Sequence, residues 1–320
     1  MSVEPSTSHR QGLSRWTIIR FLLLLAIVVL VFACWTMPRL SSNQPGQPAL
    51  SFVPQPADTP LLDEKGRVRM EAFLGLSAHP VMQPKGMLET IEKHAVGEDA
   101  AMIVEALRFI RDPDLYKRMD ATLARILDQR PGKSYRQWFR VLWDADATGH
   151  PKYAEYKSKM YLRIDERFQE YFYYGSQTPA PKIRLDEIAW GGVKRDGIPP
   201  LEDPKTLAVS QATYLDDNDV VFGVSINGDA RCYPKRILAW HEMVRDTVGG
   251  IPINGVYCTL CGSMIVYDTR LDGRQYHLGT SGFLYRSNKL MYDRQTKSLW
   301  NTLRGAPVVG PLVDQGIQLK

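Results

Sequence analysis

The chain has 320 residues, and its formal net charge of +5 comes from lysines and arginines spread along its length. Since no basic tract stands out, we expect no nucleic-acid partner. The four cysteines are too few for a disulfide scaffold, and with Cys34 inside an apolar run they are too few for a four-cysteine zinc site.

An apolar run near the N-terminus predicts a membrane anchor. Residues 18–37 are almost entirely apolar and are about long enough to cross a hydrocarbon core of ~30 Å. Arg10, Arg15 and Arg20 precede its uninterrupted apolar part, residues 21–37, and only Arg39 follows closely. The positive-inside rule therefore puts residues 1–17 in the cytoplasm and everything after the run outside.

Two other interpretations of this run stay open. Residues 31–34 (VFAC) resemble a lipobox, which would make the protein a lipoprotein attached at Cys34. The run could also be a cleaved signal peptide, although it lacks a clean small-x-small site. All three interpretations export the rest of the chain. We expect a single-pass protein of the inner membrane with its main domains periplasmic, held off the membrane by the proline-rich linker 38–60.

A helical domain is expected over residues 61–175. From Met87 onward, apolar residues recur at three- and four-residue spacing. The pattern predicts helices over 100–110, 115–127, 135–145 and 153–171, resembling a small helical-repeat bundle without a visible repeat period. Residues 112–114 (DPD) break the first of these helices and cap the second. The many aromatic residues between Tyr135 and Tyr174 have helical spacing, so we expect them to pack against the domain that follows.

Residues 176–320 predict a β-rich domain, so the fold class is α+β. Strands are expected over 220–226, 229–233, 253–257, 263–267, near 275–278 and over 290–292. Asn227-Gly228 and Asp272-Gly273 are hairpin signals, and 237–244 is expected to be a short helix. A partly closed barrel is one arrangement of these strands. Because Val308 and Val309 begin a further strand just before residue 320, we expect the domain to lack its C-terminal piece in this sequence.

The densest set of reactive groups lies between Trp240 and Asp268. His241 and Glu242 follow the tryptophan, and a Cys-x-x-Cys-Gly at residues 258–262 follows between two expected strands. Cys258 and Cys261 could cycle between dithiol and disulfide, bind a metal, or form a permanent disulfide. His241 could generate the thiolate or complete a copper or zinc site with the two cysteines, and Glu242 could orient the histidine.

A second polar cluster is expected to bind substrate. Tyr292, Asp293 and Arg294 follow the last predicted strand, with Trp300 close behind. Asp293 and Arg294 could instead pair and cap a turn. Trp240 and Ser281 complete the predicted substrate-binding set.

Residues from about 198 to 312 resemble the uncharacterised family known as domain of unknown function 3179. The resemblance rests on 198–204 (IPPLEDP), 227–253 (NGDARCYPKRILAWHEMVRDTVGGIPI), 257–268 (YCTLCGSMIVYD), 279–300 (GTSGFLYRSNKLMYDRQTKSLW) and 305–312 (GAPVVGPL). The resemblance implies no established activity. Some members are described as selenoproteins, and by similarity the selenocysteine falls at Cys261, which favours redox or metal chemistry.

Two positions depart from the family pattern. Thr259 stands where the family usually has proline, and Cys232 stands where it usually has alanine. Cys232 could be a local addition to the site or an inert, buried thiol, and we favour the inert thiol.

Three hypotheses follow. The first is an exported thiol oxidoreductase that uses Cys258 and Cys261, needs no cofactor and exchanges electrons with an unidentified protein or small molecule. The second is a copper- or zinc-binding domain with Cys258, Cys261 and His241 as ligands. The third is a non-catalytic binding or scaffold protein with a structural disulfide.

Overall fold

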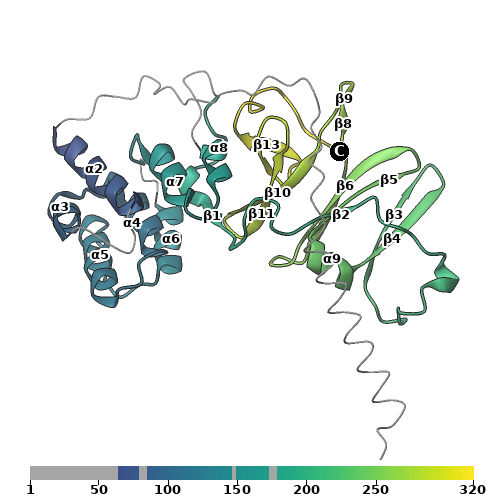
Figure 1. Cartoon of the computed structure of the whole chain (residues 1–320), viewed down its shortest axis with the longest axis horizontal. Coiled ribbons are helices and arrows are strands. Elements are labelled where there is room, and N and C mark those ends of the chain that lie inside the picture. The colour runs from purple at the N-terminus through teal and green to yellow at the C-terminus, as the bar shows by residue number, and fades with distance from the viewer. Residues whose placement is uncertain (1–63, 79–84, 146–148, 173–178) are drawn as a thin grey trace, which may run out of the picture. The chain divides into compact units, whose positions relative to one another are not determined.

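The computed structural model of the chain describes residues 64–78, 85–145, 149–172 and 179–320 (Figure 1). The predicted membrane segment 18–37 with Cys34, the cytoplasmic residues 1–17 and the linker 38–60 lie outside these ranges. Within the described ranges, no helix is long and apolar enough to cross a membrane.

The predicted helical domain is helical in the structure. Seven α-helices precede the strands in the described residues: α2 (Glu64–Ala78), α3 (Lys85–His94), α4 (Ala100–Leu107), α5 (Pro113–Ile126), α6 (Tyr135–Asp144), α7 (Tyr153–Tyr161) and α8 (Gln169–Phe172). The cap predicted between the first two expected helices is confirmed: the Asp112 carboxylate accepts hydrogen bonds from the backbone N–H groups of Asp114 and Leu115. Ser134 and Gln137 form a capping box at the start of α6.

One helix prediction needs correction, and one helix was missed. The single helix expected over 153–171 ends at Tyr161 and resumes as a 3₁₀ turn (Glu166–Phe168) followed by α8. The break occurs because the Asp165 carboxylate caps the backbone N–H of Arg167 and starts a new helical segment. Helix α2 was not predicted, since its apolar residues show no clear helical period.

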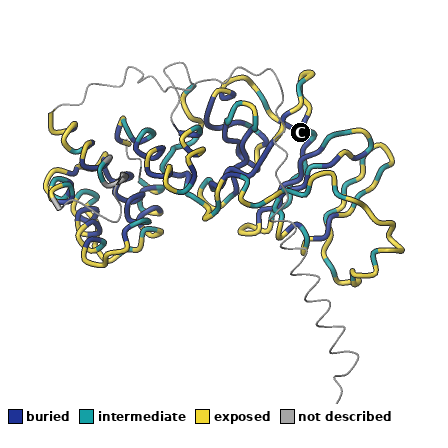
Figure 2. Tube along the Cα trace, in the orientation of Figure 1, coloured by how far each residue is buried: buried dark blue, intermediate teal, exposed yellow. Residues whose placement is uncertain are grey.

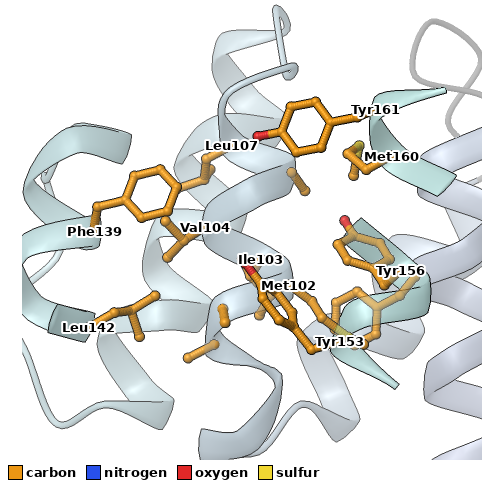
Figure 3. Packing of buried hydrophobic residues seen from close by; sticks show 14 of the residues in the cluster. Met102, Ile103, Val104, Leu107, Phe139, Leu142, Tyr153, Tyr156, Met160 and Tyr161 are labelled. Atoms are coloured by element: carbon orange, nitrogen blue, oxygen red, sulfur yellow. The ribbon is translucent and has the colours of Figure 1, made fainter. Parts of the chain in front are cut away.

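The helices share one apolar core. Figure 3 shows the side chains of α4, including Val104 and Leu107, between those of α6 and α7. Tyr156 and Tyr161 of α7 are fully buried there. This core is continuous with buried residues of the sheet that follows, among them Phe283 and Leu290.

The predicted aromatic packing against the following domain is confirmed. Phe283 lies in a strand. The centroid of its ring is 5.1 Å from that of Tyr161, 4.7 Å from that of Phe168 and 5.0 Å from that of Phe172. These edge-to-face contacts fix the end of the helical part on one sheet, because aromatic pairs in this geometry add to the gain from burial.

The described residues contain both helices and sheets, mostly in separate segments, which confirms the α+β class. The sheets are open, so the partly closed barrel is wrong for the described residues. One sheet has the order β1-β10-β11-β12-β13 and a second the order β2-β5-β6-β7, while β3-β4 and β8-β9 are two-stranded. Both larger sheets keep free edge strands, so neither closes on itself. Figure 2 shows how strongly β10 and β11 are buried.

The strand bounds are as follows: β1 (Ile188–Trp190), β2 (Leu201–Glu202), β3 (Val221–Ile226), β4 (Asp229–Pro234), β5 (Met243–Val248), β6 (Ile251–Cys258), β7 (Ser263–Asp268), β8 (Arg270–Leu271), β9 (Arg274–Gln275), β10 (Leu278–Tyr285), β11 (Asn288–Asp293), β12 (Leu299–Asn301) and β13 (Ala306–Val309). Both hairpin signals are confirmed. Asn227 and Gly228 join β3 to β4, Asp272 and Gly273 join β8 to β9, and all four have positive φ.

The sequence analysis missed β1, β2, β5, β10 and β12. The strand expected near 275–278 is also misplaced, since β9 ends at Gln275 and β10 begins only at Leu278. Six of the eight residues of β10 are buried, so the strand lacks the alternation of apolar and polar residues that marks a strand with one exposed face.

Candidate functional site

The Cys-x-x-Cys motif occupies the tight turn between β6 and β7, as predicted. β6 ends at Cys258, β7 begins at Ser263, and these two residues are paired across the ladder. The backbone N–H of Gly262 donates to the carbonyl of Cys258 at 2.8 Å. Gly262 adopts a φ of +65°, which glycine reaches without a steric penalty. The turn therefore brings the two Cα atoms to 5.5 Å, and Cys258 and Cys261 form a disulfide.

The two sulfur-bearing residues differ in exposure. Cys258 is 2% exposed, whereas Cys261 is exposed at the tip of the turn. Leu260 between them is 70% exposed. A molecule in solution therefore reaches the disulfide from the Cys261 side.

Glu242 connects the Trp-His-Glu triplet to this turn. Helix α9 (Lys235–His241) ends there because Glu242 adopts a left-handed conformation with a φ of 54°. The chain then enters β5, so the helix expected over 237–244 is too long at its C-terminal end. One carboxylate oxygen of Glu242 accepts from the Thr259 hydroxyl at 2.7 Å, between the two cysteines.

The other carboxylate oxygen of Glu242 binds Lys289, a residue that the sequence analysis did not single out. Lys289 Nζ lies 3.0 Å from Glu242 Oε2, and the lysine side chain is only 5% exposed. Burial lowers the pKa of Lys289, and the Glu242 carboxylate opposes this shift. No periodicity or motif distinguishes this lysine, because its partner is 47 residues away in the sequence.

Asn288, also missed, contacts the exposed cysteine. Its side-chain amide nitrogen donates to Cys261 Sγ at 3.0 Å, and the Ser263 hydroxyl lies 3.5 Å from the same sulfur. The contacts of Asn288 and Lys289 therefore bring the start of β11, from one sheet, to the Cys-x-x-Cys turn and to Glu242, which lie at the ends of strands of another sheet.

His241 and Trp240 lie at the end of α9, next to Glu242. His241 Nδ1 is 2.9 Å from the carbonyl oxygen of Pro199. Because a carbonyl can only accept, Nδ1 bears the hydrogen in this contact, and in the neutral ring Nε2 keeps the lone pair. Trp240 is 82% exposed.

The second predicted cluster is organised around Asp196. The Tyr292 hydroxyl donates to Asp196 at 2.5 Å, and Arg294 makes two hydrogen bonds to the same carboxylate, at 2.9 and 3.1 Å. Burial raises the pKa of Tyr292, and the hydrogen bond to Asp196 raises it further. Tyr292 and Arg294 are thus both held by the carboxylate of Asp196.

The remaining predicted substrate-binding residues are buried. Asp293 is fully buried and accepts from the backbone and hydroxyl of Thr296, both at 2.7 Å, across the turn that follows β11. The Ser281 hydroxyl is fully buried and donates to the carbonyl of Leu290 at 2.6 Å. Trp300 is fully buried in an apolar cluster.

Cys232 is exposed, which corrects the expectation of a buried thiol. It lies on β4 in the wall of a mainly apolar pocket of about 410 Å³, together with Leu201, Leu207 and Ile237. The prediction failed because β3 and β4 form a two-stranded sheet of their own, in which alternate residues face solvent.

Within the described ranges, no group of three or more His, Cys, Asp and Glu side chains is placed to share a metal ion. In this structure Cys258 and Cys261 are bonded to each other.

Residues 195–320 match the family model described as protein of unknown function (DUF3179). The chain contains a domain of this family. The match includes α9, the Cys-x-x-Cys turn and the start of β11, so every contact of the disulfide and of Glu242 described above lies inside the DUF3179 domain. Searches of curated proteins and of solved structures found no match.

Proposed function

We propose that the DUF3179 domain of this chain is a thiol–disulfide oxidoreductase with Cys258 and Cys261 as its redox pair. The observation that supports it most strongly is the asymmetry of the disulfide, with one sulfur-bearing residue buried and the other exposed at a turn. Thiol–disulfide exchange requires an in-line approach to one sulfur, and the turn leaves Cys261 open to it.

The reaction would proceed through Cys261. A thiolate of a partner dithiol attacks Cys261 Sγ, the Cys258–Cys261 bond breaks, and its electron pair stays on Cys258. The second thiolate of the partner then attacks the partner sulfur in the mixed disulfide, and Cys261 leaves with the electron pair. The partner is oxidised to a disulfide, and the two protons that its thiols lose are taken up by Cys258 and Cys261.

The short loop also argues against a mainly structural disulfide. In the chain-entropy description, closing a loop of about four residues stabilises the folded state by only about 2 kcal/mol, compared with about 3 kcal/mol for a loop of 15. The hairpin between β6 and β7 already holds the two Cα atoms together, which reduces this contribution further.

The proposal is tested by equilibrating the full-length protein, in mild detergent, with mixtures of reduced and oxidised glutathione. Thiols are then trapped by acid and alkylation and assigned to residues by mass spectrometry. We expect the Cys258–Cys261 bond to open and close reversibly, with a midpoint less negative than about −300 mV. A Cys232→Ser variant serves as the control and should titrate like the unmodified protein. A bond that stays closed across the glutathione range would instead favour a structural disulfide.

Activity is measured separately, with a peptide dithiol as the substrate. Oxidised protein should convert it to the disulfide in a stoichiometric burst that Cys261→Ser abolishes and Cys232→Ser leaves unchanged. We further propose that this reaction occurs outside the cytoplasm, on the basis of the apolar run 18–37. An alkaline phosphatase fused after residue 60 is active only after export, so an inactive fusion would contradict this location.

A further inference from the structure

The start of β11 contacts both the disulfide and Glu242. Asn288 donates a hydrogen bond to Cys261, and the neighbouring Lys289 binds the carboxylate of Glu242, which in turn holds Thr259. The two residues are adjacent in sequence and reach the turn from a different sheet. One short segment therefore supports both the exposed sulfur and the loop that presents it.

The Asn288 contact is stronger for one redox state than for the other. A disulfide sulfur is a weak hydrogen-bond acceptor, whereas a thiolate is negatively charged and accepts a charge-assisted hydrogen bond. The amide at 3.0 Å therefore stabilises Cys261 more as a thiolate than as part of a disulfide or as a protonated thiol.

The rest of the Asn288 side chain is consistent with this role. Its amide oxygen is buried and has no hydrogen-bond partner among the described residues. An unpaired buried carbonyl costs stability, so the residue is poorly explained as a structural hydrogen-bonding group alone. The fully made contact is the one from its amide nitrogen to the sulfur.

We propose that Asn288 is a catalytic residue that stabilises the Cys261 thiolate as it leaves the mixed disulfide. This proposal rests on the oxidoreductase function proposed above. In that step the partner's second thiolate attacks the partner sulfur, the bond to Cys261 breaks, and the electron pair remains on Cys261 Sγ, where the Asn288 amide meets it. Lys289 acts as a positioning residue through Glu242 and Thr259.

The test is the pH dependence of Cys261 alkylation by iodoacetamide in the full-length chain. Cys258→Ser and Cys232→Ser are combined so that Cys261 has no disulfide partner, and mass spectrometry follows the peptide that contains residue 261. Asn288→Leu removes the donor and keeps the branching and the number of side-chain heavy atoms, and Asn288→Asp replaces the amide by a carboxylate of the same shape. Asn218→Ala, at an exposed asparagine in a turn, is the matched control.

We expect Asn288→Leu to raise the midpoint of the alkylation profile by about one pH unit, which lowers the rate at pH 7 about 10-fold. Asn288→Asp should raise the midpoint further, because it puts a negative charge beside the thiolate. Asn218→Ala should leave the profile unchanged. Unchanged midpoints in both Asn288 variants, with circular dichroism matching that of the parent, would overturn the proposal. Because aspartate has the same shape as asparagine, the Asn288→Asp variant still tests the proposal if Asn288→Leu does not fold.

This outcome can be separated from a failure of the proposed function, because the alkylation profile requires neither a redox partner nor Cys258. If the Cys258–Cys261 bond cycles with glutathione and the midpoints stay unchanged, only the role of Asn288 is wrong. If the bond does not cycle, the role of Asn288 in exchange falls with the proposed function.

Discussion

The ion pair between Glu242 and Lys289 should be unequally sensitive to the loss of either partner. The Lys289 side chain is 5% exposed and that of Glu242 18%, so the lysine has less water to replace a lost partner. Breaking a buried ion pair typically costs 3–5 kcal/mol, because it leaves an uncompensated charge. We expect Glu242→Gln to lower the free energy of unfolding by about 3 kcal/mol, near the lower end, since the amide can still accept a hydrogen bond from Lys289.

The reciprocal variant should be milder. Lys289→Met has a similar length and leaves a Glu242 carboxylate that keeps some solvent contact and the Thr259 hydroxyl. We expect the free energy of unfolding to fall by about 1.5 kcal/mol. In the double variant it should fall by less than the sum of the two single losses, because methionine removes the charge that Glu242→Gln leaves without a partner. Urea unfolding followed by tryptophan fluorescence in one detergent measures all three, with the exposed Lys205→Met as the control.

The pH dependence provides a second measure of the same pair. The folded-state pKa of Lys289 lies below its ordinary value, chiefly because of burial. Between the lowered pKa and the unfolded value of about 10.4, the unfolded chain binds more protons than the folded chain, so stability due to this group rises with pH. The unfolding free energy of the parent minus that of Lys289→Met should therefore increase as the pH approaches 10. The reasoning would be refuted if the losses of the two single variants add up to that of the double variant within about 0.5 kcal/mol. It would also be refuted if the difference in unfolding free energy between the parent and Lys289→Met falls with pH.

Two further predictions concern the thiols and the core. In the native, unreduced protein, a maleimide should label Cys232 and leave Cys258 and Cys261 unmodified, because only Cys232 is a free cysteine in the described part of the chain; labelling of Cys261 without reductant, detected by peptide mapping, would contradict the disulfide. Phe283→Ala should lower the unfolding free energy by about 3–5 kcal/mol, since the ring is 1% exposed and packs on the aromatic rings of α7 and α8. Leu303→Ala, at a side chain 58% exposed, is its control and should stay within about 0.5 kcal/mol of the parent in the same urea titration.

The sequence predicts well those features that depend on residues close together in the chain. The Asp112 cap, the Asn227-Gly228 hairpin and the Cys-x-x-Cys turn each arise from neighbours within a few positions, and the structure has all three. Strand β10 was missed because burial on both faces removes the alternation that marks a strand. Asn288 and Lys289 were missed because their partners lie 27 and 47 residues away, a distance over which no sequence period applies.

The difference between near and distant partners also explains why the sequence singled out Glu242 but not its contact with Lys289. A carboxylate beside a histidine suggests an orienting partner, and the sequence analysis assigned Glu242 that role. In the structure its oxygens accept from Thr259 and Lys289, while the described contact of His241 is with Pro199. The left-handed conformation at Glu242 directs the chain out of α9 and into β5, next to β6 and its terminal Cys258. Glu242 thus links α9, the Cys-x-x-Cys turn and the start of β11, and its ion pair with Lys289 contacts that turn through Thr259, whereas the described contact of His241 does not.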